Sequence, residues 1–190
     1  MRNISITTPL KRSVAESLRA GDAVEISGYI YVARDAAHLR MLDALESGRE
    51  MPFELEGQVI YYMGPCPAPS GAVIGSAGPT TSKRMDKMTP PLLARGLRGM
   101  IGKGPRSPEV IEAIQRSRAV YFAAIGGIGA LLSQYVTEKE VIAYPELGAE
   151  AVLRLKVDRM PLIVAVDSKG GNLYQLGQET YRREENTGRG

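Results

Sequence analysis

Residues 78–86 read Gly-Pro-Thr-Thr-Ser-Lys-Arg-Met-Asp, and this stretch separates two different sequence patterns in the middle of the chain. Apolar residues at 72–75 precede it, which predicts a short strand. Helix-forming residues follow it, which predicts a helix over residues 80–95, with Pro90-Pro91 interrupting or restarting that helix. The sequence therefore places residues 78–86 at a junction between a strand and a helix.

The chemistry of this junction favours a negatively charged ligand. Thr80 or Thr81 is a natural N-cap, because a hydroxyl accepts a hydrogen bond from the first turn of a helix. Free backbone N–H groups and the helix dipole attract an anion there, and Arg84 offers a bidentate grip on a carboxylate. The alternative is a capped helix with Lys83 and Arg84 in solvent.

The same pattern recurs at two other places in the chain. Arg34 follows the predicted strand 29–33, and Lys103 follows the predicted strand 99–102. In open α/β sheets, ligands bind outside the carboxyl ends of the strands. We therefore expect Arg34, Arg84 and Lys103 to converge on a ligand with two or more carboxylates.

The remaining pattern predicts an α/β domain with a mixed sheet, because strands dominate both ends and alternate with helices between them. We expect strands at residues 4–7, 23–27, 29–33, 58–63, 72–75, 99–102, 119–125, 140–144, 151–157 and 162–166. We expect helices at 13–19, 34–46, 80–95 and 107–118, a turn and helix at 126–135, and a hairpin turn at 169–172. The core should be aliphatic, because the chain has no Trp and only 2 Phe.

Composition excludes several classes of function. The 190 residues are 44% apolar and 24% charged, which is typical of a soluble globular protein. The net charge is only +3, without a block of basic residues, so we expect no nucleic-acid partner. No run resembles a signal peptide or a membrane span, which favours a cytoplasmic protein without membrane contact. Cys66 stands alone, so this chain by itself cannot form a disulfide framework, a cysteine zinc site or an iron–sulfur cluster.

Three motifs in a fixed order carry a family resemblance over nearly the whole chain: Ala-Arg-Asp-Ala-Ala-His at 33–38, the stretch at 78–86, and Gly-Lys-Gly at 102–104. Together they resemble the β-subunit of class I fumarate hydratase, a domain that also occurs in L(+)-tartrate dehydratase. The resemblance implies a swivelling β/β/α fold over residues 1–181, and we expect residues 182–190 to be a disordered tail. It implies a hydro-lyase that reversibly hydrates fumarate to malate. Alternatives are a β-subunit that converts tartrate to oxaloacetate, and a non-catalytic scaffold subunit that binds organic anions.

The resemblance also implies a partner and a cofactor. The family uses a [4Fe–4S] cluster held by three cysteines of the other domain, and Cys66 is taken here as an incidental thiol. We expect a separate α-subunit to carry the cluster, with the active site between the subunits. The assembly would be a hetero-oligomer, with a homodimer of this chain as a further option.

Carried over position by position, the resemblance assigns roles to five residues. Arg34, Arg84 and Lys103 correspond to the cations that bind the substrate carboxylates. Thr80 corresponds to the threonine near the C3 proton and is the candidate base, and Thr81 corresponds to its neighbour that contacts substrate. Proton removal beside a carboxylate builds negative charge there, so Lys103 is a candidate for catalysis as well as for binding.

Other polar residues have less specific interpretations. His38 lies one helical turn after Arg34, and a structural role is favoured over contact with substrate. Asp35 and Asp86 are candidates to brace the neighbouring arginines, with a solvated carboxylate as the alternative for Asp86. Residues 126–129 lack the spacing of a phosphate loop and are expected to form a tight turn. Lys83 stands where a small residue is typical of the family, and its role is open between solvent exposure and specificity.

Overall fold

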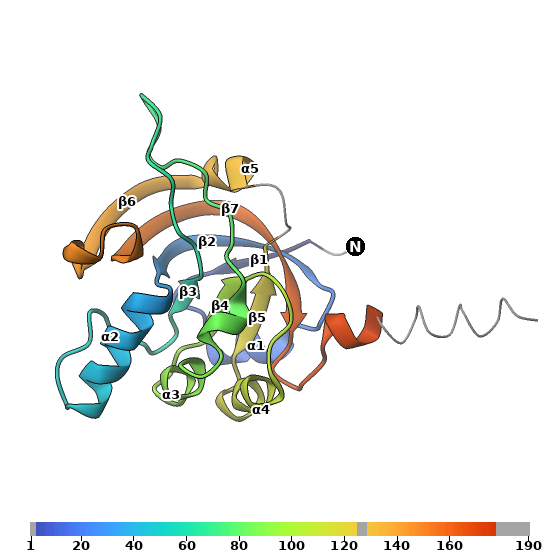
Figure 1. The fold of residues 1–190 in the computed structure, drawn as a ribbon. Helices are drawn as coiled ribbons and strands as arrows, with labels where there is room; N and C mark the ends of the chain where they lie inside the picture. The colour runs from blue at the N-terminus through green and yellow to red at the C-terminus, as the bar shows by residue number, and fades with distance from the viewer. Residues whose placement is uncertain (1–2, 125–128, 178–190) are drawn as a thin grey trace, which may run out of the picture.

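The computed structural model describes residues 3–124 and 129–177 of the chain (Figure 1). The strands are β1 (Asn3–Thr7), β2 (Ala23–Val32), β3 (Val59–Tyr61), β4 (Gly99–Gly102), β5 (Val120–Ala123), β6 (Val136–Ala143) and β7 (Val152–Val166). The α-helices are α1 (Arg12–Ser17), α2 (Asp35–Glu46), α3 (Thr89–Ala94), α4 (Pro108–Ser117) and α5 (Gly129–Ser133), and the 3₁₀-helices are η1 (Ser82–Met85) and η2 (Pro145–Glu150). These elements form one mixed sheet with helices packed against it, as the sequence predicted.

The sheet closes on itself. Its strand order is β1-β2-β3-β4-β5-β7-β6, in which β1 to β5 pair in parallel and β7 runs antiparallel to its neighbours. An additional antiparallel pairing joins β7 to β2. The strands β2, β3, β4, β5 and β7 therefore form a complete ring, and β1 and β6 extend it as outer strands.

Two strands are longer than the sequence pattern indicated. The predicted pair 23–27 and 29–33 is the single strand β2, because Gly28 forms a β-bulge rather than a turn. Gly28 has φ +112°, and a Cβ atom there would lie 2.5 Å from the Thr8 hydroxyl oxygen, so only glycine fits. The predicted pair 151–157 and 162–166 is likewise the single strand β7. The polar residues between its halves stay in the strand, where Arg159 contacts Glu25 of β2 at 3.1 Å.

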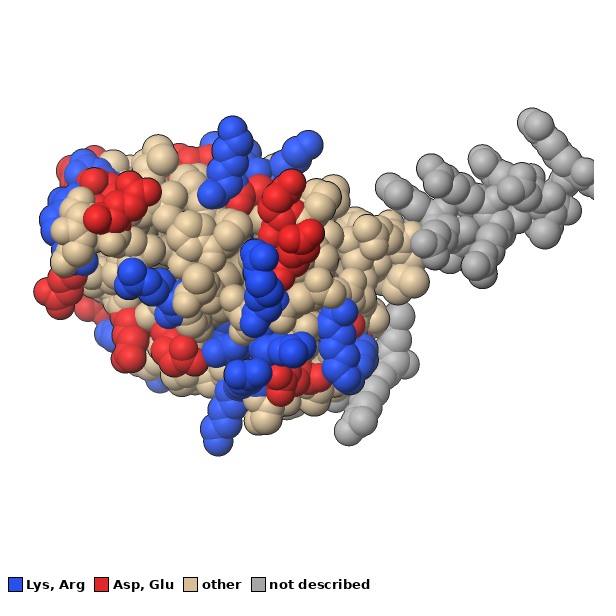
Figure 2. Space-filling model, turned by 90° about the horizontal axis from the view of Figure 1, so that it is seen from below, with Lys and Arg blue, Asp and Glu red and all other residues tan. Residues whose placement is uncertain are grey.

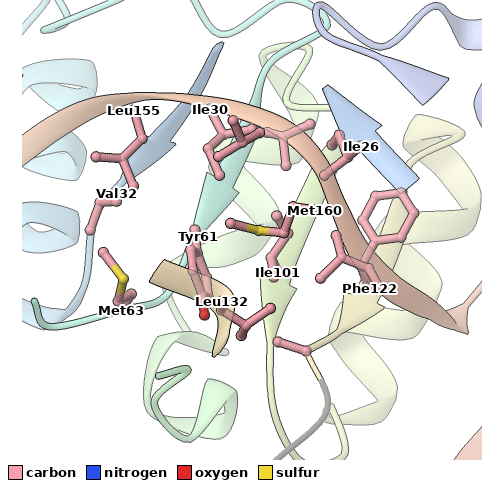
Figure 3. Packing of buried hydrophobic residues seen from close by; sticks show 14 of the residues in the cluster. Ile26, Ile30, Val32, Tyr61, Met63, Ile101, Phe122, Leu132, Leu155 and Met160 are labelled. Atoms are coloured by element: carbon pink, nitrogen blue, oxygen red, sulfur yellow. The ribbon is translucent and has the colours of Figure 1, made fainter. Parts of the chain in front are cut away.

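The core has two parts. One fills the ring, where side chains of β7 such as Leu155 and Met160 face those of the parallel strands (Figure 3). The other lies between the outer face of the sheet and helices α2, α3 and α4. The expectation of an aliphatic core was wrong in one respect, because Tyr61, Tyr62 and Tyr121 are fully buried. Their hydroxyls have partners, as buried tyrosines require: the Tyr61 hydroxyl, for example, donates to the carbonyl of Ala77.

Several local predictions were wrong or lie outside the described residues. Residues 72–75 form a bend rather than a strand, and the helix expected over 80–95 is reduced to η1 and α3, with α3 beginning directly before Pro90-Pro91. The turn at 169–172 is confirmed by a bridge between Val166 and Asn172. The tail 182–190 and most of 126–129 are not described. Within the described residues, no helix is long and apolar enough to cross a membrane.

Candidate active site

The predicted site residues lie at one edge of the sheet. Strands β2, β3 and β4 are parallel neighbours, so their carboxyl ends meet at the same edge. Arg34 lies two residues beyond β2, and Lys103 directly follows β4. Thr80 is attached beyond the end of β3, where its backbone N–H donates to the carbonyl of Tyr62 at 2.8 Å. The topology thus places segments distant in sequence side by side.

A shared carboxylate links two of the three cations. The Nε and Nη2 atoms of Arg84 donate to the two oxygens of Asp35 at 2.9 and 2.7 Å, which is a bidentate pair. The Nε of Arg34 lies 4.0 Å from the same carboxylate. The two guanidinium groups are therefore neighbours, and the prediction that Asp35 braces the arginines is confirmed.

A second carboxylate, Glu150 of η2, holds Arg34 from the other side. Its Oε1 accepts from Arg34 Nη2 at 2.5 Å, and its Oε2 accepts from the backbone N–H of Ala36 at 2.8 Å. The hydrogen bond from Arg34 lowers the pKa of Glu150 below its ordinary value. Gly64 completes the arrangement, because a side chain there would occupy the space of the Arg34 guanidinium. Sequence reasoning missed Glu150, which is 116 residues from Arg34 and has no local motif.

Lys103 is fastened to the segment that carries the two threonines. Thr81 and Lys103 form a parallel bridge. The Lys103 carbonyl accepts from the Ser82 N–H at 3.0 Å, and the Lys103 N–H donates to the Ser82 hydroxyl at 3.1 Å. The Ser82 hydroxyl also lies 2.9 Å from the Tyr121 hydroxyl, so its position is fixed. In the described part of the chain no carboxylate pairs with the exposed Lys103, which leaves its amine available for a ligand.

The N-cap prediction for the two threonines was wrong. Thr81 is the residue before η1, but its hydroxyl makes no capping hydrogen bond, and η1 has only four residues. So short a 3₁₀ turn gives little of the dipole that a long helix provides. Any anion bound here is therefore held by the side-chain cations rather than by a helix terminus.

His38 supports Arg34 from inside the domain. The side chain is fully buried, its Nδ1 lies 3.0 Å from the Arg34 carbonyl, and its ring packs edge-on against Tyr62. Burial lowers the pKa of His38 to about 4, so the ring is neutral at physiological pH and Nδ1–H is the donor. Its burial supports a structural role rather than contact with substrate.

Asp86 braces a different arginine from the predicted one. It pairs with Arg106 at 2.6 Å rather than with Arg84, and both members are buried, so a solvated Asp86 is excluded. Arg106 also donates to Thr89 Oγ1 at 2.9 Å, and its guanidinium lies over the ring of Tyr62 at 5.3 Å. This buried ion pair holds η1 and α3 behind the site, and nothing local in the sequence indicated it.

The described residues do not fit an iron–sulfur cluster. Such clusters are held by several thiolates, whereas Cys66 is the single cysteine of the sequence and is exposed. Across residues 3–124 and 129–177, no group of three or more His, Cys, Asp or Glu side chains is placed to hold a metal ion. The arginine and lysine side chains at this edge of the sheet are suited to binding an anion.

The fold and this cationic edge define an α/β domain suited to binding small anions. Residues 1–177 match the family model described as "Fumarase C-terminus", and the chain belongs to this family. The family resemblance seen in the sequence is thereby confirmed.

Two kinds of relative share this domain. The chain is 35% identical over 176 residues to the anaerobic class I fumarate hydratase of Escherichia coli (strain K12), covering 90% of this chain and 32% of that protein. It is 38% identical over 154 residues to the mitochondrial fumarate hydratase 1 of Leishmania major, covering 80% and 28%. The chain thus spans about a third of the fumarate hydratases it matches. It is 37% identical over 181 residues to the putative L(+)-tartrate dehydratase subunit beta of Methanocaldococcus jannaschii, covering 92% of this chain and 93% of that protein.

Proposed function

We propose that this chain is the β-subunit of a cytoplasmic class I fumarate hydratase, which reversibly hydrates fumarate to malate together with a separate α-subunit. Family membership supports this proposal, as do the contacts of Arg34 and Arg84 with Asp35 and the bridge between Lys103 and Thr81. The single observation that carries it is the pair of arginines held on either side of Asp35, because substrates of this class carry two carboxylates.

A β-subunit of L(+)-tartrate dehydratase is the second candidate. The relative with that name matches this chain over 93% of its own length, which favours a two-subunit enzyme. The two substrates differ by one hydroxyl, which pocket geometry recognises. An anion-binding scaffold without catalysis is the remaining alternative, and it differs from both enzymes in requiring no turnover.

The cations bind and orient the substrate in the proposed mechanism. Arg34, Arg84 and Lys103 contact the two carboxylates, and Thr81 adds a hydroxyl contact. Asp35 and Glu150 fix the two guanidinium groups before substrate arrives, which lowers the entropic cost of binding. When the C3 proton of malate is removed, negative charge builds on the adjacent carboxylate, and the cations stabilise that charge most strongly in the transition state.

Thr80 is the proposed base that takes the C3 proton. A threonine hydroxyl is a poor base at neutral pH unless another group activates it. Among the described residues no acid or base side chain lies within hydrogen-bonding distance of the Thr80 hydroxyl, so we assign the activating group to the α-subunit. We assign the [4Fe–4S] cluster to the α-subunit as well, because this chain lacks the thiolates that a cluster requires.

The proposal is tested with the assembled two-subunit enzyme, assayed anaerobically on fumarate, malate and both tartrate isomers. Arg84→Ala should lower kcat/KM by roughly 10²- to 10³-fold, because it removes a charge that stabilises the transition state. Thr80→Ala should lower kcat with little change in KM. Lys83→Ala is the matched control, since it removes an exposed neighbouring cation, and it should leave turnover unchanged. If neither Arg84→Ala nor Thr80→Ala affects turnover, the assignment is wrong.

A further inference from the structure

A second cationic site lies at the opposite end of the sheet. A cavity of about 650 Å³ opens between α3 and α4, and Glu56, Arg98 and Ser117 of its lining stand just before β3, β4 and β5. Figure 2 looks at the molecule from this side and shows basic side chains gathered around a few acidic ones. Because Arg34 and Lys103 follow the carboxyl ends of β2 and β4, this cavity is distinct from the candidate active site.

Arginines outnumber carboxylates in the lining of the cavity. Arg12, Arg95, Arg98 and Arg116 line it together with Glu56, and we call these five residues the arginine pocket. Glu56 pairs with Arg98 at 2.8 Å, and Arg12 pairs with Glu16 at 3.1 Å. Within the described ranges, the guanidinium groups of Arg95 and Arg116 have no hydrogen-bond or ion-pair partner, so they are free to bind a ligand.

Arg98 is held in the wall of the pocket by contacts within the chain. It is only 7% exposed, and it donates to the Ser117 carbonyl through Nη1 and to Glu56 through Nη2. Its buried Nε has no partner among the described residues. That Nε is shielded from solvent, so an anion in the cavity would not reach it; the anion would instead offset the repulsion between the arginines that line the cavity.

The rest of the lining restricts the kind of anion. Leu93, Ala94 and Ala113 form an apolar wall, and none of the described residues that line the cavity is aromatic. A nucleobase would therefore find no ring on which to stack. Guanidinium groups bind phosphate and carboxylate oxygens equally well by geometry. We propose that the arginine pocket binds a compact multivalent oxyanion bearing phosphate or carboxylate groups.

The test is isothermal titration calorimetry of the purified full chain with pyrophosphate and, separately, with citrate. Both probes are multivalent, so the two arms distinguish a phosphate from a carboxylate ligand. The pocket variant is Arg95→Ser/Arg116→Ser, which removes the two unpaired cations. The control is Arg40→Ser/Arg49→Ser, which removes two charges that pair with Glu146 and Asp43, outside the pocket. Thermal unfolding verifies that each variant is folded.

We expect at least one probe to bind the unmodified chain with a Kd below about 1 mM. Affinity should be at least tenfold weaker in the pocket variant and nearly unchanged in the control. The proposal is overturned if neither probe binds, or if the pocket variant and the control lose affinity equally, since the attraction would then be general rather than local. Because the measurement needs neither the α-subunit nor turnover, its outcome is independent of the proposed hydratase activity.

Discussion

Protonation of His38 should make folding of the domain strongly dependent on pH. Burial holds the pKa of His38 near 4 in the folded state, against an ordinary value of 6.5. Between these values the unfolded chain binds the proton and the folded chain does not, so acid favours unfolding. The stabilisation is present above pH 6.5 and is lost as the pH falls towards the folded-state pKa. Going from about pH 7 to about pH 5 should cost about 2 kcal/mol of unfolding free energy.

Urea unfolding followed by circular dichroism, at a series of pH values between those limits, measures this cost directly. His38→Leu provides the comparison, because His38 is the only histidine of the chain and few other groups titrate in this range. The variant's own stability will differ, but its unfolding free energy should depend on pH by about 2 kcal/mol less than that of the unmodified chain. Equal pH dependence in the two proteins would refute the reasoning, because the buried ring would then not be the titrating group.

Three further substitutions test the contacts around the site. Glu150→Gln removes the charged partner of Arg34 and should raise the KM of the assembled enzyme for fumarate by about tenfold, measured by steady-state kinetics. An unchanged KM would contradict a positioning role for Glu150. Asp86→Asn leaves the buried Arg106 without its counter-ion and should lower the unfolding free energy of the domain by about 3 kcal/mol, measured by urea unfolding. A decrease in unfolding free energy below about 1 kcal/mol would show that the ion pair is dispensable. Gly102→Ala places a methyl group against the Ser82 hydroxyl of η1 and should lower the unfolding free energy by about 1–3 kcal/mol. A thermal unfolding midpoint equal to that of the unmodified chain would show that η1 can move to accommodate the methyl group.

Most individual elements of the fold could be predicted from the sequence, but the pairing between distant strands could not. Local patterns located β1, β3, β4 and β5, because β1 alternates apolar and polar residues and the other three are short apolar runs between turn residues. The same logic divided β2 at Gly28 and β7 at residues 158–161, where glycine, polar residues and proline are typical of turns. Both segments remain extended because long-range pairing between β2 and β7 fixes them, and sequence periodicity carries no information about that partner.

The candidate site likewise contains some contacts that could be predicted from the sequence and others that could not. Asp35 was predictable as a brace because it adjoins Arg34 in the sequence. Glu150 and Arg106 were not, since each meets its partner only through the tertiary fold. The capping prediction for Thr80 and Thr81 assumed a regular helix over residues 80–95. In the structure the bonds of Ser82 to Lys103 and Tyr121 hold this segment beside β4 instead.

Completion of the ring by β7 sets an order of events during synthesis. The segment that joins β2 to β5 is β7, the last strand among the described residues, so a nascent polypeptide cannot complete this barrel until residue 166 has left the ribosome. Until then β2 and β5 each expose an unpaired backbone edge, the kind of surface on which aggregation begins. The paired residues of β2 and β7 lie more than 100 positions apart in the sequence. Closure of the barrel is therefore slow, because the chain between the two strands loses conformational entropy before their contacts form.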